Sequence, residues 1–348
     1  MGSMTHSLGR LAVAGTTLAL LSTGLTGCGL LDGSSPVEDA LEYLPADATT
    51  FLFVDRAAIA DRLGLEDLST GASEDELQEW ADANQDEGYG TELNAWVRVM
   101  QDAAFSDLDV EWEASGTSTD DGRVTVWKLD DDVDFDAIAD DLADAGYERG
   151  ESGGIETFEA SLEDADENGL YGGRYPAALT SLALVPDEHL VLSGAVELAV
   201  DVAEDDEDSL SDEGSFADLL DQAPDAGDLE YAGLTLEPLC GAGARITPEQ
   251  AAQQYEGLGH PDGGLALFAA PDAVSAVRLF GDEADAEGDA DGLESYLDER
   301  ASATGFDVDL DVQADGKAVI AEASFDDRRT MVQAWSRVDG PFACPLGK

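Results

Sequence analysis

Apolar and polar residues recur along the first part of the chain with periods that predict both strands and helices. Residues 49–55 read TTFLFVD, a short run of β-branched and aromatic residues that predicts a buried strand. Residues 56–63 place apolar side chains four positions apart, as in a helix that buries one face. Residues 74–104 continue the helical period, with an interruption near residues 88–90. The pattern therefore mixes strands and helices from its start.

The segment that begins at Asp134 predicts a helix together with both of its ends. Phe135, Ile138 and Leu142 fall on one face of this helix. Asp134 is placed to cap its first turn, and Gly146 is placed to end it. The surrounding patterns predict strands at residues 110–114, 123–129 and 155–160, a hairpin at residues 181–193 and a helix at residues 195–203.

The second half of the chain carries a similar succession of elements. Its patterns predict a short helix at residues 216–222, strands at 229–236 and 264–270, a helix at 272–280, an acidic loop at 281–292 and a helix from 293 to 305. The remaining residues predict a hairpin of strands 307–313 and 317–325 and a final helix at 327–337.

The two parts share an order of strand, helix, glycine with an aromatic residue, and strand. This order occurs around Gly146-Tyr147 and again around Gly305-Phe306. The acidic stretch 204–215 between the parts is typical of a solvated connector. The sequence therefore predicts an α+β fold of two related halves, residues 41–205 and 216–348, each an antiparallel sheet with helices packed on one face.

Residues 1–27 have the organisation of an export signal. A short segment with Arg10 and no acid precedes the apolar run 11–21, which is too short to span a bilayer. Residues 25–28 read LTGC and resemble a bacterial lipobox, in which small residues precede a cysteine that receives diacylglycerol before cleavage. The resemblance implies a mature chain that begins at lipidated Cys28. The alternative is an ordinary secretory signal, cut nearby, with Cys28 incidental.

Residues 28–40 are expected to tether a folded body to the membrane, because residues 29–36 read GLLDGSSP and are mostly small and polar. The body opens with residues 44–49, LPADAT, which lead into FLFVD at residues 51–55. With the lipobox and the repeated helix-Gly-aromatic-strand unit, this opening resembles exported bacterial proteins of unknown function that are common in actinobacteria. The resemblance implies a surface location and an α+β fold, and it implies no catalytic residue.

Acidic residues dominate the composition. The chain has 78 Asp and Glu against 16 Lys and Arg, a formal net charge of −62. Such a surface repels phosphate backbones, which disfavours nucleic acid as a partner. The acidity fits a salty or acid-exposed habitat, where salt screens the repulsion, and it fits equally a genome whose codons favour Asp. Apolar residues still make up 43%, enough for a buried core.

Cys240 and Cys344 are the cysteines that follow Cys28. In an oxidising extracellular space such a pair predicts a disulfide, and two separate buried thiols are the alternative. The bond would close a loop of about 100 residues, for which loop entropy predicts roughly 4 to 5 kcal/mol of stabilisation. It would also hold the C-terminal tail against the body.

No catalytic motif of the sequence has the structural context that its chemistry requires. His189 and His260 are the histidines outside the signal, the first at a predicted hairpin tip and the second in a turn-rich loop. Residues 150–154, GESGG, match the letters of Gly-x-Ser-x-Gly, but a strand and not a helix is predicted to follow them, so they form no nucleophile elbow. No HExxH motif or phosphate-binding loop is present. The sequence therefore predicts a protein that is not an enzyme and that has no cofactor unless it binds calcium. An enzyme is the third interpretation, and a deep pocket joining His260 to a serine and a carboxylate would support it.

Calcium is the one ligand that a motif suggests. Asp164, Asp166 and Asn168 occupy alternate positions of the sequence DADENG, which matches the first half of a calcium loop. The twelfth position is Tyr175 and not the bidentate Glu, so the loop is incomplete. The sequence EGDADG at residues 287–292 is a second, weaker match. Both segments also fit solvated acidic turns.

Together these patterns favour a lipid-anchored protein on the extracytoplasmic face of the cell membrane, acting as a non-enzymatic binding or structural module. The membrane is its expected partner, reached through the lipid on Cys28. An extracytoplasmic carrier or calcium-binding lipoprotein is the alternative. An apolar cavity between sheet and helices would support the carrier.

Overall fold

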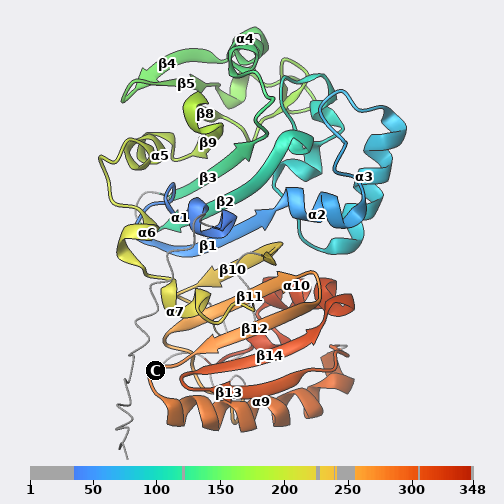
Figure 1. Cartoon of the computed structure of the whole chain (residues 1–348), viewed down its shortest axis with the longest axis vertical. Coiled ribbons are helices and arrows are strands. Elements are labelled where there is room, and N and C mark those ends of the chain that lie inside the picture. The colour runs from blue at the N-terminus through green and yellow to red at the C-terminus, as the bar shows by residue number, and fades with distance from the viewer. Residues whose placement is uncertain are drawn as a thin grey trace, which may run out of the picture. The chain divides into compact units, whose positions relative to one another are not determined.

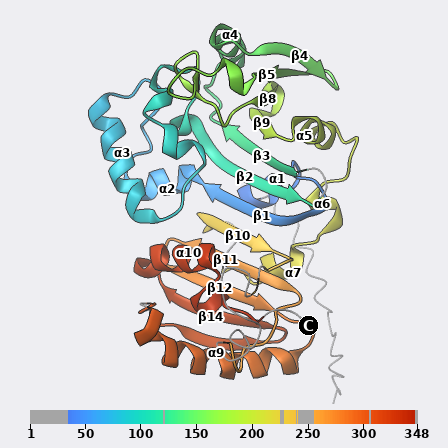
Figure 2. The same ribbon diagram turned by 180° about the vertical axis from the view of Figure 1, so that it is seen from behind.

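One antiparallel sheet of twelve strands organises the folded part of the chain. The computed structural model describes residues 35–119, 122–224, 228–238, 240, 255–304 and 306–345, and for residues 85–86 and 299–304 it describes the backbone alone. The strands lie in the order β13-β14-β12-β11-β10-β1-β2-β3-β9-β8-β5-β4 (Figure 1, Figure 2). A large antiparallel sheet accompanied by helices is the α+β architecture that the sequence predicts.

The strands of this sheet come from the whole length of the folded part. They are β1 (Ala48–Asp55), β2 (Val110–Ser118), β3 (Gly122–Leu129), β4 (Glu148–Ser152), β5 (Ile155–Glu159), β8 (Ser181–Val185), β9 (Leu190–Gly194), β10 (Tyr231–Thr235), β11 (Gly264–Ala270), β12 (Ala273–Leu279), β13 (Asp311–Asp315) and β14 (Ala318–Ser324). Two short strands, β6 (Leu170–Tyr171) and β7 (Tyr175–Pro176), pair separately.

Helices connect the strands. They are α1 (Pro36–Leu41), α2 (Arg56–Leu63), α3 (Glu74–Glu87), α4 (Phe135–Ala145), α5 (Val196–Ala203), α6 (Leu210–Glu213), α7 (Ala217–Leu220), α9 (Glu283–Thr304) and α10 (Arg328–Arg337). Short 3-10 turns include η1 (Leu93–Trp96) and η2 (Val99–Asp102). The helical period predicted for residues 74–104 therefore forms α3 and then breaks into these turns.

Helices cover both faces of the sheet. We call face A the face that carries Leu52 and Val54 of β1, and face B the face that carries Phe51 and Phe53. On face A, α2, α3, α9 and α10 pack with one apolar cluster and α4 packs with another. On face B, α1, α5, α6 and α7 pack with a third cluster. The predicted packing on one face is therefore wrong, because central strands such as β11 are buried on both sides.

Local signals predicted α4 correctly at both ends. The Asp134 carboxylate accepts hydrogen bonds from the backbone N–H groups of Asp136 and Ala137, as an N-cap residue does. Gly146 ends the helix with φ of 102°, a left-handed conformation that a side chain would strain. Both signals act within a few residues, so the sequence alone carries them.

The predicted helix at residues 272–280 is wrong, because most of this segment is strand β12. The strand lies between β11 and β14 and is apolar on both sides. Val274 and Ala276 face cluster residues on face A, and Val277 and Leu279 face those on face B. A strand that is buried on both faces loses the alternation that distinguishes it from a buried helix.

The predicted loop at residues 281–292 is also wrong, because most of it is the first half of α9. Its glycines suggested a loop, but Gly292 has a packing role. A Cβ at this position would lie 1.9 Å from the carbonyl oxygen of Gly257, so only glycine lets that backbone approach the helix. Asp289 of the same helix is buried and forms an ion pair with Arg278 of β12.

The structure pairs the two late cysteines as the sequence predicts. The Cα atoms of Cys240 and Cys344 lie 4.9 Å apart and their sulfur atoms are bonded. Leu265 of β11 and Trp335 of α10 pack around them. The bond therefore holds the C-terminal segment against the sheet.

Candidate functional site

A polar cleft interrupts face A between its two apolar clusters. It consists of a hollow of about 270 Å³ over β10, β1 and β2 and a hollow of about 150 Å³ over β3 and β9, and Arg123 lines both. We call these two hollows the face A cleft. Helices cover the sheet on either side of it, so its floor is the sheet itself.

Strand register brings the floor together from five strands. One row of opposed residues crosses the sheet from β10 to β9: Gly233, Leu52, Ser115, Thr125 and Ser193. The next row contains Thr235, Thr50, Thr117 and Arg123. Of the hydroxyl-bearing residues, Ser115, Thr125 and Ser193 are buried. Most of face A is apolar, so this group of hydroxyls marks the cleft as a different kind of surface.

Two tryptophans line the cleft from opposite sides. Trp335 comes from α10, and Trp96 comes from η1. A Cβ at Gly233 would lie 3.2 Å from the indole nitrogen of Trp335 and 3.0 Å from the Tyr231 hydroxyl. The glycine therefore allows the Trp335 indole to lie close against the sheet.

The charged groups of the cleft neutralise each other. The guanidinium of Arg123 lies 2.5 Å from a carboxylate oxygen of Glu92 and donates a hydrogen bond of 2.8 Å to the Ser115 hydroxyl. Both charged side chains are more than two-fifths exposed, so the pair contributes little to stability. Its effect is to leave the cleft lining without net charge.

A buried carboxyl group adjoins the cleft. Glu113 lies two residues before Ser115 on β2 and is fully buried. One of its oxygens accepts hydrogen bonds from the indole of Trp127 (2.5 Å) and the backbone N–H of Glu92 (2.7 Å), and the other has no partner. Burial raises the pKa of Glu113 to about 8, which the two hydrogen bonds only partly offset. The group is therefore protonated and uncharged at neutral pH.

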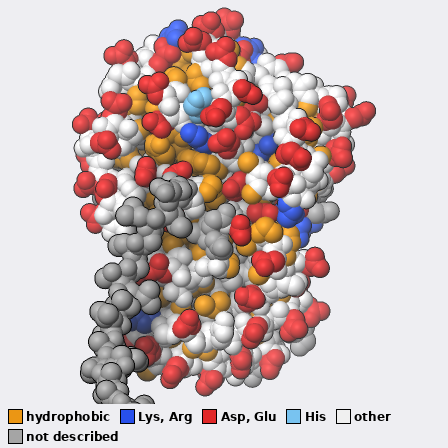
Figure 3. Space-filling view, in the orientation of Figure 1, with side chains coloured by type: hydrophobic (Ala, Val, Ile, Leu, Met, Phe, Trp, Pro, Cys, Tyr) orange, Lys and Arg blue, Asp and Glu red, His pale blue; other side chains and the backbone are white. Residues whose placement is uncertain are grey.

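The face A cleft is unusual in a chain with so many acids. Asp and Glu are more than one residue in five, and Figure 3 shows their side chains spread over the face in view. A groove of about 1050 Å³ beside β4 and α5, on the side of face B, follows this trend: eight of its eighteen lining residues are acids, and Arg149 is its single base. In the cleft, Glu92 is the single acid.

A buried ionic network lies on face A next to the cleft. Glu87 of α3 accepts hydrogen bonds from Arg62 of α2 and Arg328 of α10. Glu230 accepts hydrogen bonds from Arg62 and from the hydroxyl of Tyr89. Burial acts to raise the pKa of Glu87, but the hydrogen bonds from the two arginines hold it below its ordinary value. The network joins the first half of the chain to the second.

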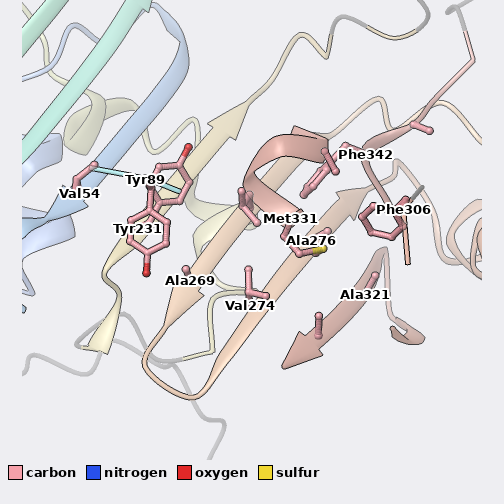
Figure 4. Packing of buried hydrophobic residues seen from close by; sticks show 14 of the residues in the cluster. Val54, Tyr89, Tyr231, Ala269, Val274, Ala276, Phe306, Ala321, Met331 and Phe342 are labelled. Atoms are coloured by element: carbon pink, nitrogen blue, oxygen red, sulfur yellow. The ribbon is translucent and has the colours of Figure 1, made fainter. Parts of the chain in front are cut away.

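Aromatic rings reinforce the same junction. The guanidinium carbons of Arg62 and Arg328 lie 4.7 and 4.3 Å from the centre of the Phe325 ring. The rings of Tyr89 and Tyr231 lie 5.1 Å apart, and Figure 4 shows them beside Val54 of β1. Arginines, carboxylates and rings from both halves thus pack as one unit.

The other predicted site residues lie apart from the cleft. The Asp166 carboxylate accepts hydrogen bonds from the backbone N–H groups of Asn168 (2.7 Å) and Leu170 (3.0 Å), so it closes its own turn. Over the residues that the structure describes, no three or more His, Cys, Asp and Glu side chains gather as a metal site would. Residues 287–292 are helical and form no calcium loop. Cys28 lies outside the described residues.

The two histidines lie in different surroundings. His189 has φ of 52° at the β8–β9 turn, and its ring packs edge-on against Phe135. The ring nitrogen Nδ1 of His260 lies 3.3 Å from the carbonyl oxygen of Pro345. Neither residue lines the face A cleft.

Comparison with known proteins identifies no relative, since no family model, no curated protein and no solved structure matches the chain. Within the described residues, no helix has the length and apolar character needed to cross a bilayer.

Sequence patterns missed the cleft for a physical reason. Thr125 lay within a predicted strand, whereas Ser115 and Thr117 lay beyond the predicted end of their strand at residue 114, because β2 continues to Ser118. Their meeting with Ser193 and Thr235 depends on the pairing of strands that are far apart in the chain. The available signal was the Ser and Thr content of these strands.

Proposed function

We propose that the chain is an exported, lipid-anchored binding protein that works on the extracytoplasmic face of the cell membrane and is not an enzyme. The face A cleft carries the binding part of this proposal, because it is a polar and electrically balanced hollow in an acidic molecule. The pairing of Cys240 with Cys344 favours an oxidising compartment. The lipobox-like sequence before Cys28 supports the anchor.

We also propose that the body consists of two related halves, residues 41–205 and 216–348. The order of the twelve-stranded sheet supports this, because its first-half strands lie together from β1 to β4 and its second-half strands lie together from β10 to β13. In the second half, β10, β11 and β12 are followed by α9 and the hairpin β13–β14, with β14 next to β12. In the first half, β1, β2 and β3 are followed by α4 and the hairpin β4–β5.

One insertion accounts for the difference between the two strand orders. The hairpin β8–β9 lies between β3 and β5 in the first half, where the second half pairs β12 directly with β14. Helices α4 and α9 pack on the same face of the sheet. A duplication followed by insertion of one hairpin explains both observations, and it places the larger hollow of the cleft at the junction of the halves.

The anchor is tested by metabolic labelling of the native host with an alkyne analogue of a fatty acid. We expect the protein to be labelled and to sediment with membranes, and Cys28→Ala to remove both properties. A variant with Cys240→Ala and Cys344→Ala is the control, and it should keep the label. Equal labelling of the Cys28→Ala protein would contradict the anchor and favour an ordinary secretory signal.

A further inference from the structure

We infer that the face A cleft binds a neutral, hydroxyl-rich small molecule with the chemistry of a mono- or disaccharide. The inference deepens the proposed function by naming the ligand class. It rests on the chain's being a binding protein, and it does not depend on the lipid anchor.

Charge is the first argument for a neutral ligand. Ten residues line each hollow, and among them the charged side chains are Arg123 and Glu92. These two form an ion pair with each other, so neither offers a free charge to a ligand. An anion would need an unpaired base in the cleft, and a cation would find far more acid in the groove beside β4.

Hydrogen-bonding capacity is the second argument. The Ser115 hydroxyl accepts a hydrogen bond from Arg123, so its own proton remains to be donated. The Ser193 hydroxyl donates to the carbonyl oxygen of Ser181, so its lone pairs remain to accept. Thr125 lies opposite both of them on β3. Neighbouring strands are about 4.8 Å apart, so the row offers donors and acceptors in turn at the scale of a small ring.

The walls of the cleft provide the third argument. Trp335 and Trp96 offer apolar ring surface on either side of a polar floor. Sugars have the matching character, with hydroxyl groups at the ring edge and C–H groups on the ring faces. Pockets for drug-sized ligands have about 300–1,000 Å³. The hollows of about 150 and 270 Å³ both lie below the lower end of this range, so they fit a compact ligand of one or two rings.

The buried carboxyl of Glu113 is consistent with this chemistry. It accepts a hydrogen bond from the backbone of Glu92, which lines the smaller hollow, and it is two residues from Ser115 on β2. A carboxyl group without charge adds no preference for a cation. Glu113 lines neither hollow, so it acts on the cleft through Glu92 and strand β2 and not by direct contact with a ligand.

The test uses the chain that begins after Cys28, so that its outcome is independent of lipidation. The probes are glucose, galactose and maltose, with glucosamine and glucuronate as ring analogues of opposite charge. The readout is the indole N–H signals of the five tryptophans in nitrogen-15 NMR spectra, which single Trp→Phe variants assign. We expect a neutral sugar to shift the signals of Trp335 and Trp96 in a saturable way. The signal of Trp112, which packs on face B, should not move.

A hydroxyl deletion locates the site. Thr125→Val keeps the shape of the side chain and removes its hydroxyl, and we expect the affinity for the bound sugar to fall about three- to tenfold. Thr157→Val in the acidic groove is the matched control and should leave the affinity unchanged. The inference is overturned if no neutral sugar gives saturable shifts, if a charged analogue binds more tightly, or if Thr157→Val weakens binding as much as Thr125→Val.

Discussion

A carboxyl group buried between two apolar clusters holds its proton more tightly than one in water. Burial raises the pKa of Glu113 to about 8, whereas in the unfolded chain it is about 4.3. Between these pH values the folded chain keeps a proton that the unfolded chain has lost. The folded state is therefore most stable relative to the unfolded state below about pH 4, where both hold the proton. This contribution of Glu113 to the unfolding free energy is lost as the pH rises to about 8.

Glu113→Gln should therefore flatten the dependence of stability on pH, because glutamine is neutral throughout. We expect the wild-type chain to lose about 2–4 kcal/mol more of its unfolding free energy between pH 5 and pH 9 than the variant does. Urea titrations at constant ionic strength measure this difference. Glu322→Gln, at an exposed position of β14, should leave the wild-type slope intact. Equal slopes for Glu113→Gln and the wild type would show that Glu113 is ionised in the folded state.

Individual residues differ in how far the sequence predicts their roles. The cap by Asp134 and the helix end at Gly146 were readable, because each acts on its immediate neighbours. The role of Arg278 was not readable, because its segment, residues 272–280, was predicted to be a helix and is mostly a strand. Arg278 is fully buried, where it pairs with Asp289 of α9 and donates to the carbonyl oxygens of Ala343 and Gly259. Its partners come from three distant segments.

The same distinction holds for whole elements. α2 and β11 have the bounds that the sequence predicts, since one shows a clear helical period and the other an apolar run flanked by glycine and proline. β12 and α9 were mistaken because each depends on neighbours: the strand is buried on both faces, and the helix contains Gly292 where another backbone passes. The cleft has the same origin, since its floor exists only after five strands have paired.

The ionic network around Glu87 joins helices α2 and α3 of the first half to α10 of the second half, so losing it should destabilise the whole fold. Replacing Glu87 by Gln removes the charge that Arg62 of α2 and Arg328 of α10 share, and it leaves two partly buried guanidinium groups without a full partner. We expect Glu87→Gln to lower the unfolding free energy by about 2–4 kcal/mol at pH 7, measured by urea denaturation.

The position of the substitution decides the size of this effect. Glu79→Gln, at an exposed position of the same helix α3, should change the unfolding free energy by less than about 0.5 kcal/mol. The loss from Glu87→Gln should shrink as the pH falls, because the low pKa of Glu87 stabilises the folded chain only while the group is ionised. Equal effects of the two substitutions would show that the network adds nothing to the junction of the halves.

At the scale of the whole molecule, the charge is a property of the surface and not of the fold. Most buried positions of the sheet are apolar, and six of the described acids are buried. Glu87, Glu230 and Asp289 are paired with arginines, and Asp107, Asp109 and Glu113 accept hydrogen bonds. The unpaired acids therefore lie mostly on the outside. Folding brings them onto one compact surface, whereas the unfolded chain spreads them apart, so their repulsion costs the folded state more.

Salt should reduce this cost and raise the melting temperature of the chain that begins after Cys28. Screening shortens the range of the repulsion from about 10 Å at 0.1 M ionic strength to about 3 Å at 1 M. We expect a clear rise in melting temperature with sodium chloride, and the same rise with choline chloride, because screening depends on ionic strength and not on the cation. A response to sodium alone would indicate a specific site. Millimolar calcium at constant ionic strength should have no further effect unless the loop at Asp164 binds it, and Asp164→Ala would then remove that effect. An unchanged melting temperature in both salts would show that the excess negative charges are too dispersed to destabilise the fold.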